Sequence, residues 1–140
     1  MRALIVDTDV ASFLFKGDTR ADLYTPHLAD AVPGLSFMSL AELEQWAIMR
    51  NWGAQKHAEM LRFVKEGFVV IDSNEAPCRQ WAEVRGEAKR AGRKIETSDA
   101  WVAATASLYD MPLVTHNAAD FNFLHGLKAG EFLMDNYAHS

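Results

Sequence analysis

The sequence contains very little cysteine and no long apolar run. Cys78 is the one cysteine among 140 residues, which excludes an internal disulfide framework and any zinc site built from several cysteines. No apolar stretch approaches the ~20 residues that a membrane-spanning helix needs. The N-terminus enters a strand-like run at once, without the charged and then apolar pattern of a leader peptide. These absences predict a cytoplasmic protein with no membrane association.

The sequence also lacks the common nucleotide-binding loops and the usual setting of a nucleophilic side chain. Neither a GxGxxG nor a P-loop pattern follows the first strand-like run, which argues against dinucleotide and nucleoside-triphosphate binding. None of four candidate nucleophiles lies in a nucleophile-elbow pattern: Ser12, Ser36, Ser39 and Cys78. A metal-activated water is therefore the better candidate nucleophile.

Positive charge is scarce as well. The chain has 14 Lys and Arg against 19 Asp and Glu, and its net charge of −5 argues against a protein that coats nucleic acid through bulk charge. Four cations nevertheless lie within six residues: Lys89, Arg90, Arg93 and Lys94. This run is either a solvated helix end that complements the helix dipole or a local path for a nucleic-acid backbone.

What the chain does have is an alternation of short apolar runs and helix-length segments. Strands are predicted at residues 3–6, 35–38, 68–71 and 112–115, with a weaker one at 131–134. Helices are predicted at 20–31, 40–52, 54–66, 75–91 and 98–110. Such an alternation indicates a single α/β domain over residues 1–140, with a mainly parallel sheet of four to five strands covered on both faces. The strand runs are apolar throughout, as burial on both faces requires.

Acids stand at or just beyond the ends of several apolar runs. In chain order they are Asp7 with Asp9, Glu42, Asp72 and Asp120. Because ligands bind outside the carboxyl ends of the strands in an open α/β sheet, we expect acids placed there to converge on one crevice. Clustered carboxylates resist ionising together unless a cation compensates them, so the pattern predicts a divalent-metal site.

The acids are expected to have different roles. Asp9 is well placed to cap a helix over residues 10–15, which leaves Asp7 without a capping role and favours a functional one. Glu42 lies in the first turn of the next predicted helix, where it either complements the helix dipole or points to the end of the sheet. Asp99 repeats this arrangement in a later helix, which Thr97 or Ser98 is expected to cap.

The residues after the fourth apolar run complete the candidate site. Asn117 either caps a short helix or supplies an amide oxygen to a metal, and Asp120 can join the same cluster. His116 is expected to be ordinary polar surface, and the other histidines show no spacing typical of zinc ligands. Ligation by oxygen alone points to Mg²⁺ or Mn²⁺.

Four segments of the chain also form an ordered set of motifs. They are Asp7-Thr8-Asp9, Ser39-Leu40-Ala41-Glu42-Leu43, and the segments 99–106 and 113–121. Together they resemble the motifs of the PIN domain family, most of all its VapC-type toxins of bacterial toxin–antitoxin pairs. The resemblance covers nearly the whole chain and implies a three-layer α/β/α fold.

The resemblance further implies an endoribonuclease that depends on Mg²⁺ or Mn²⁺ and hydrolyses RNA phosphodiester bonds with a metal-activated water. Asp7, Glu42 and Asp99 match the core acids of the family. Some relatives have Asp where this chain has Asn117, so the fourth contribution comes from Asn117, from Asp120 or through water.

The remaining expectations concern the surroundings of the acids and the partners. Thr8, Ser39 and Thr115 are candidates to orient the carboxylates or the water. The basic run at 89–94 could guide the RNA backbone. The resemblance implies a homodimer and a small VapB-like antitoxin, and the large apolar side chains at 40–66 either pack in the core or form a surface for such a partner.

Two alternatives belong to other classes of protein. A receiver-like signalling domain also carries strand-end aspartates and Mg²⁺, but it needs a Lys at the end of its last strand, and the sequence offers none there. A non-catalytic binding module with a degenerate acidic cluster is the second alternative.

Overall fold

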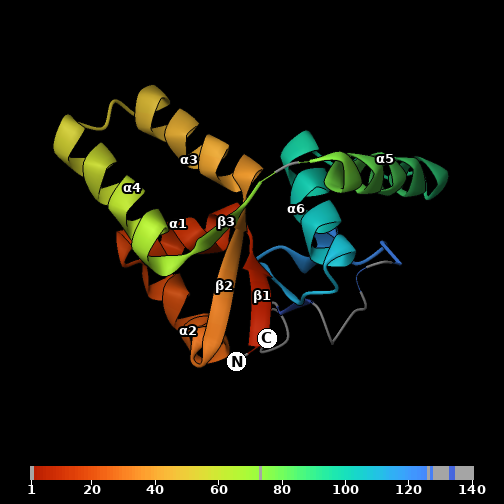
Figure 1. Ribbon diagram of the computed structural model, residues 1–140, viewed down its shortest axis with the longest axis horizontal. Coiled ribbons are helices and arrows are strands. Elements are labelled where there is room, and N and C mark those ends of the chain that lie inside the picture. Colours follow the sequence, from red (N-terminus) through yellow and green to blue (C-terminus); the bar gives the residue numbers. More distant parts are fainter. Residues whose placement is uncertain (1, 73, 126, 128–132, 135–140) are drawn as a thin grey trace.

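The predicted alternation of strands and helices is confirmed. The computed structural model describes residues 2–72, 74–125, 127 and 133–134 (Figure 1). Its strands are β1 (Arg2–Val6), β2 (Ala31–Ser36), β3 (Val69–Ile71), β4 (Leu113–Val114) and β5 (Leu133–Met134). Its helices are α1 (Thr8–Lys16), η1 (Thr19–Leu23), α2 (Thr25–Leu28), α3 (Phe37–Met49), α4 (Ala54–Gly67), α5 (Glu75–Arg90), α6 (Thr97–Leu108) and η2 (Ala118–Asp120).

The five strands form one parallel sheet in the order β3-β2-β1-β4-β5. β1 is central, so the chain after its carboxyl end lies in the middle of that edge of the sheet. The weak strand predicted at 131–134 corresponds to β5, and its residues 131–132 lie outside the described residues. No helix among the described residues is long and apolar enough to cross a membrane.

Helices cover both faces of the sheet, and successive residues of β1 pack on opposite faces. Leu4 and Val6 belong to a buried cluster with side chains from α1, α3 and α4. Ile5 points to the other face, where it joins a cluster built largely from α5 and α6. Figure 1 shows these two layers, with α1, α2 and α4 on one side of β1 and β2 and α5 with α6 on the other. The α/β/α expectation is therefore confirmed.

Two predicted boundaries in the first half of the chain are wrong. The helix predicted at 20–31 is two shorter segments, η1 and α2, because Pro26 lacks the N–H that a continuous helix would need. The strand predicted at 35–38 is β2, which ends at Ser36, and α3 begins at once. The Ser36 hydroxyl accepts a hydrogen bond from the Met38 N–H (3.2 Å), so it caps the helix before the apolar run is over.

Gly34 allows β2 to pack between its neighbours. An added Cβ would lie 3.0 Å from Ile5 Cδ1, 3.1 Å from Ile71 Cδ1 and 3.2 Å from the Leu4 carbonyl oxygen. These contacts come from β1 and β3, the strands on either side of β2. The absence of a side chain therefore lets the isoleucines of both neighbours close over β2, directly below the edge that carries the acids.

Candidate functional site

A pocket at the carboxyl edge of the sheet brings together acids from four separate segments. Its cavity has a volume of about 190 Å³. The polar residues that line it come from the start of α1, from α3, from the start of α6 and from the segment around η2: Asp7, Thr8, Asp9, Glu42, Glu96, Ser98, Asp99, Asn117 and Asp120. All five acids proposed from the sequence motifs to act or to cap at this edge therefore face one cavity.

Asp7 is the N-cap of α1, which corrects the assignment of that role to Asp9. The helix begins at Thr8, directly after the turn out of β1, and the Val10 N–H donates to Asp7 Oδ1 (3.0 Å). The Thr115 hydroxyl donates to Asp7 Oδ2, and the Asn117 N–H in turn donates to Thr115 Oγ1 (3.1 Å). The Asp7 carboxylate therefore both caps α1 and lines the pocket.

The pKa of Asp7 is strongly perturbed. Only 6% of the residue is exposed, and this burial, aided by the nearby negative charges of Asp9 and Asp99, raises its pKa from the usual 3.8 to about 7. The hydrogen bonds from Thr115 and from the Val10 N–H act in the opposite direction but do not cancel the effect of burial. A buried carboxyl of this kind gains from any partner that compensates its charge.

Asp9 belongs to the site, although its residue type alone suggested only a cap. It lies in the first turn of α1, half-buried, and Asn117 Nδ2 donates to Asp9 Oδ2 (3.2 Å). Asn117 makes no side-chain cap of η2. The sequence did contain a sign that Asp9 belongs to the site: it lies two residues after Asp7, and a cap residue and a first-turn residue can face the same end of a helix.

Glu42 is oriented by a short network of hydroxyls. The Thr8 hydroxyl lies 2.6 Å from Glu42 Oε1 and 2.8 Å from Ser39 Oγ. Because a hydroxyl has one proton and an ionised carboxylate only accepts, Thr8 donates to Glu42 and the Ser39 hydroxyl supplies the proton of the other bond. Glu42 lies in the second turn of α3, not the first, because the helix starts at Phe37.

Asp99 is the second acid with a strongly raised pKa. Burial, followed by the negative charges of Asp120, Glu42, Asp9 and Glu96, raises its pKa from the usual 3.8 to about 7. It lies in the first turn of α6, whose N-cap position is taken by Glu96 and not by either residue expected there. Glu96 makes no side-chain cap and lines the pocket, so it belongs to the site although none of the sequence motifs includes it.

The acids line one pocket, but their side chains do not form a compact group of metal ligands. Among the described residues, no three side chains of His, Cys, Asp or Glu are grouped closely enough to hold a metal ion. The donors that line the pocket are nevertheless all oxygens apart from the Asn117 amide nitrogen, which already donates to Asp9. Such a donor set suits Mg²⁺ or Mn²⁺, which keep several waters and need only one or two carboxylates.

Other residues singled out from the sequence lie beside the pocket or away from it. His116 packs its ring edge-on to Phe13 (5.0 Å between centroids), and its Nδ1 lies 2.5 Å from the Tyr24 hydroxyl. Asp72 is exposed and does not line the pocket. Of the basic run, Arg93 donates to the Ala119 carbonyl oxygen of η2 (3.1 Å), which joins the end of α5 to the corner that carries Asp120.

The sequence and the fold are similar to those of known proteins. The chain is 26% identical over 131 residues to Ribonuclease VapC1 from Haemophilus influenzae strain R2866, covering 89% of this chain and 93% of that protein. Its fold matches VapBC2 from Rickettsia felis, a structure with bound promoter DNA, with a TM-score of 0.81, 19% identity and coverage of 95% and 98%. It also matches a toxin–antitoxin complex from Klebsiella pneumoniae with a TM-score of 0.66, 23% identity and coverage of 89% and 94%. The family model of the PIN domain matches residues 4–123, and the chain therefore belongs to the PIN domain family.

Proposed function

We propose that this protein is a metal-dependent endoribonuclease that acts as the toxin of a toxin–antitoxin pair. The observation that carries the proposal is the convergence of Asp7, Glu42 and Asp99 on one pocket, where burial and mutual repulsion raise the pKa of two of them to about 7. The similarity to a ribonuclease over 93% of its length supports the choice of RNA as substrate. Membership of the PIN family removes the receiver-like alternative.

The residues of the pocket fit Mg²⁺ or Mn²⁺. Burial and repulsion make both Asp7 and Asp99 costly to ionise, and a divalent cation is the partner that offsets this cost for several carboxylates at once. When bound, such an ion activates water and stabilises negative charge on a phosphoryl group. One or two of the acids Asp7, Glu42 and Asp99 would bind the ion directly and the others through its waters, and Asn117 and Asp120 line the same pocket.

The chain's own hydrogen bonds prepare the carboxylates for this task. Thr115 and the Val10 N–H fix both oxygens of Asp7, so this carboxylate keeps one orientation. Thr8 does the same for one oxygen of Glu42 and leaves the other oxygen to the pocket. A phosphodiester that enters the pocket therefore meets acids whose positions are set before it arrives.

The proposal includes partners. A small VapB-like antitoxin is supported by the match to a toxin–antitoxin complex, and a homodimer remains part of the proposal. Ile48 and Met49, at the end of α3, are 78% and 69% exposed. Apolar side chains of this size in water favour a surface that a protein partner covers. A cytoplasmic location is part of the same proposal, because the proposed RNA substrate and antitoxin are found there.

The test is cleavage of labelled single-stranded RNA by the full chain, with MgCl₂ or MnCl₂ and with EDTA. We expect cleavage only with metal. Asp99→Asn should reduce the cleavage rate by at least ~100-fold. Loss of a residue that only supports a metal ligand typically costs about 10–100-fold, and a ligand should cost at least as much. The matched control is Asp110→Asn, because Asp110 is exposed, lies outside the pocket and has a φ of 53° that Asn adopts readily.

Three outcomes would contradict the proposal. Cleavage that persists in EDTA, or an Asp99→Asn variant as active as the wild type, removes the metal-dependent mechanism. A wild-type protein that binds Mn²⁺ and RNA but cleaves nothing over hours is the non-catalytic binding module considered above.

A further inference from the structure

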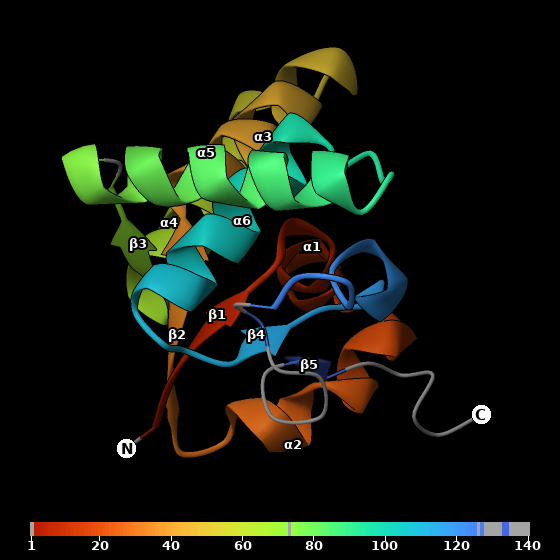
Figure 2. The same ribbon diagram turned by 90° about the vertical axis from the view of Figure 1, so that its right-hand side faces the viewer.

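A second and larger cavity adjoins the acidic pocket. It has a volume of about 570 Å³ and is formed by the last turns of α5 and the loop that leads into α6. Its lining is Arg85, Gly86, Ala88, Lys89, Arg93, Lys94, Ile95 and Glu96. Glu96 also lines the acidic pocket, so the two cavities meet at this residue. Figure 2 shows the C-terminal end of α5 turning into the loop that bounds this second cavity, named here the basic groove.

The basic groove concentrates positive charge in an acidic protein. Its lining has four cations, Arg85, Lys89, Arg93 and Lys94, against one acid, while the chain as a whole carries −5. All four are exposed. None of them takes part in an ion pair with a carboxylate among the described residues. Their charges are therefore available to an anion that enters from solvent.

Two of these exposed cations are held in place by contacts with the rest of the chain. Arg85 Nη1 donates to the Ile95 carbonyl oxygen (2.8 Å), and its guanidinium lies 5.4 Å from the centre of the Trp81 ring. Arg93 donates to Ala119 and lies 4.8 Å above the ring of Phe123. A guanidinium has five N–H groups, so each keeps several donors beyond the one it uses here. The helix and the loop that line the groove thus each present an oriented guanidinium to phosphate oxygens.

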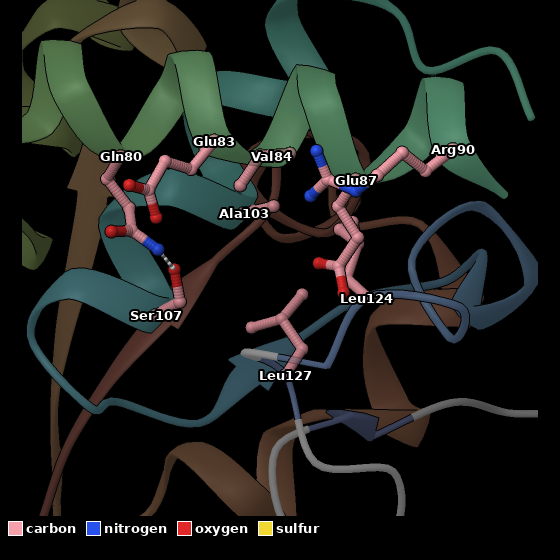
Figure 3. Close-up of a pocket in the computed structure, with 9 residues that line it drawn as sticks. All are labelled: Gln80, Glu83, Val84, Glu87, Arg90, Ala103, Ser107, Leu124 and Leu127. Atoms are coloured by element: carbon pink, nitrogen blue, oxygen red, sulfur yellow. Dashed lines mark hydrogen bonds between the residues drawn. The ribbon is translucent and has the colours of Figure 1, made fainter.

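Arg90 does not share this surface, although it lies next to Lys89 in the sequence. It lines a different cavity, whose lining also includes Glu83, Glu87 and Leu127 (Figure 3). The structure therefore divides the basic run at 89–94: three of its four cations line the groove, and Arg90 lines another cavity whose lining includes two acids.

We propose that the basic groove binds the backbone phosphates of single-stranded RNA that neighbour the phosphate in the acidic pocket. This inference rests on the proposed ribonuclease function and adds the path of the substrate. Because the two cavities share Glu96, a strand whose scissile phosphate lies among the acids continues directly into the groove. The contacts there are to phosphate and not to bases, so they add affinity without selecting sequence.

The test compares two double variants with the same change of charge. Lys89→Gln with Lys94→Gln removes two groove cations that make no hydrogen bond to the described chain. Arg79→Gln with Arg90→Gln is the matched control, since both side chains also belong to α5 but line a cavity with Glu83, and neither lines the basic groove. Cleavage of a single-stranded RNA oligonucleotide is measured with each full-length protein at several KCl concentrations, and thermal melting verifies that both variants fold.

We expect the groove variant to raise KM about tenfold at low salt with kcat nearly unchanged. The slope of log(kcat/KM) against log[KCl] should become shallower by about 1.4, or ~0.7 for each phosphate that the variant no longer neutralises. The control should change neither quantity. Equal effects in both variants, or no effect in the groove variant, would contradict RNA binding by the groove and leave the proposed ribonuclease function intact. A wild type that cleaves no RNA with metal overturns both.

Discussion

At the scale of single residues, Asp7 combines two roles that its neighbours make compatible. One oxygen caps α1 through the Val10 N–H and the other is held by Thr115. Burial of this carboxyl raises its pKa to about 7, although both hydrogen bonds act in the opposite direction. A carboxylate kept in this position without a cation nearby therefore reduces the stability of the folded protein at neutral pH, which indicates that its charge is there for a ligand.

Replacement of Asp7 by Asn tests this interpretation. Asn keeps an oxygen for the Val10 N–H but removes the buried charge, so at pH 8 in EDTA the free energy of unfolding of Asp7→Asn should exceed that of the wild type. With MnCl₂ the order should reverse, because only the wild type gains from binding the ion. Urea denaturation under both conditions is the measurement.

Asp72→Asn is the control for that experiment, because Asp72 is an exposed acid outside the pocket. Its stability should differ little from the wild type with or without metal. A loss of stability in Asp7→Asn under both conditions would mean that the carboxylate serves α1 alone.

At the scale of helices and strands, the exact start of α3 decides where Glu42 lies. Ser36 ends β2 and caps α3 in a single step, so Ser39 and Glu42 follow within the first two turns. The apolar pattern predicted both the strand and the following helix. Because Phe37 and Met38 are apolar as well, they continue the strand pattern, and the sequence does not show that β2 ends at Ser36. A cap is a hydrogen bond between one side chain and one N–H, and residue types permit several candidates for it.

Ser36→Ala should therefore affect both stability and activity. Loss of the bond to the Met38 N–H should cost about 1 kcal/mol of the free energy of unfolding. Because Glu42 is carried by the same helix, the cleavage rate should fall as well. Denaturation curves and initial cleavage rates at one RNA concentration measure the two effects.

Asn74→Ala provides the comparison, since Asn74 caps α5 through the Ala76 N–H (3.2 Å). Helix α5 carries none of the acids, and its residues of the basic groove lie towards its other end. It should lower stability by a similar amount and leave the cleavage rate unchanged. Equal losses of activity in the two variants would show that the α3 cap has no special connection to the site.

At the scale of the whole molecule, the site depends on contacts between distant parts of the chain. Asn117 donates to Asp9 across 108 residues, and Arg93 ties the end of α5 to η2. The motifs and the rule for parallel sheets predicted that acids would meet at this edge. They could not predict that Asp9 would receive an amide or that Arg90 would turn away, because both depend on side-chain direction in the assembled fold.

The assembled cluster also predicts how stability depends on pH. Asp7 and Asp99 have a pKa of 3.8 in the unfolded chain and about 7 when folded, so between these values the folded protein holds more protons than the unfolded one. By linkage, their contribution to the free energy of unfolding decreases as the pH rises from about 4 to 7, opposite to the usual trend for carboxyls.

Metal and protons therefore compete for the same two groups, and the effect of the metal should grow with pH. We expect MnCl₂ to raise the Tm of the wild type little at pH 5.5 and several degrees more at pH 8, and to leave the Tm of Asp7→Asn/Asp99→Asn nearly unchanged at both. In EDTA, the Tm of the double variant should exceed that of the wild type by more at pH 8 than at pH 5.5. A Mn²⁺-induced shift that is equal at the two pH values, or equal in the two proteins, would place the ion somewhere other than between these acids.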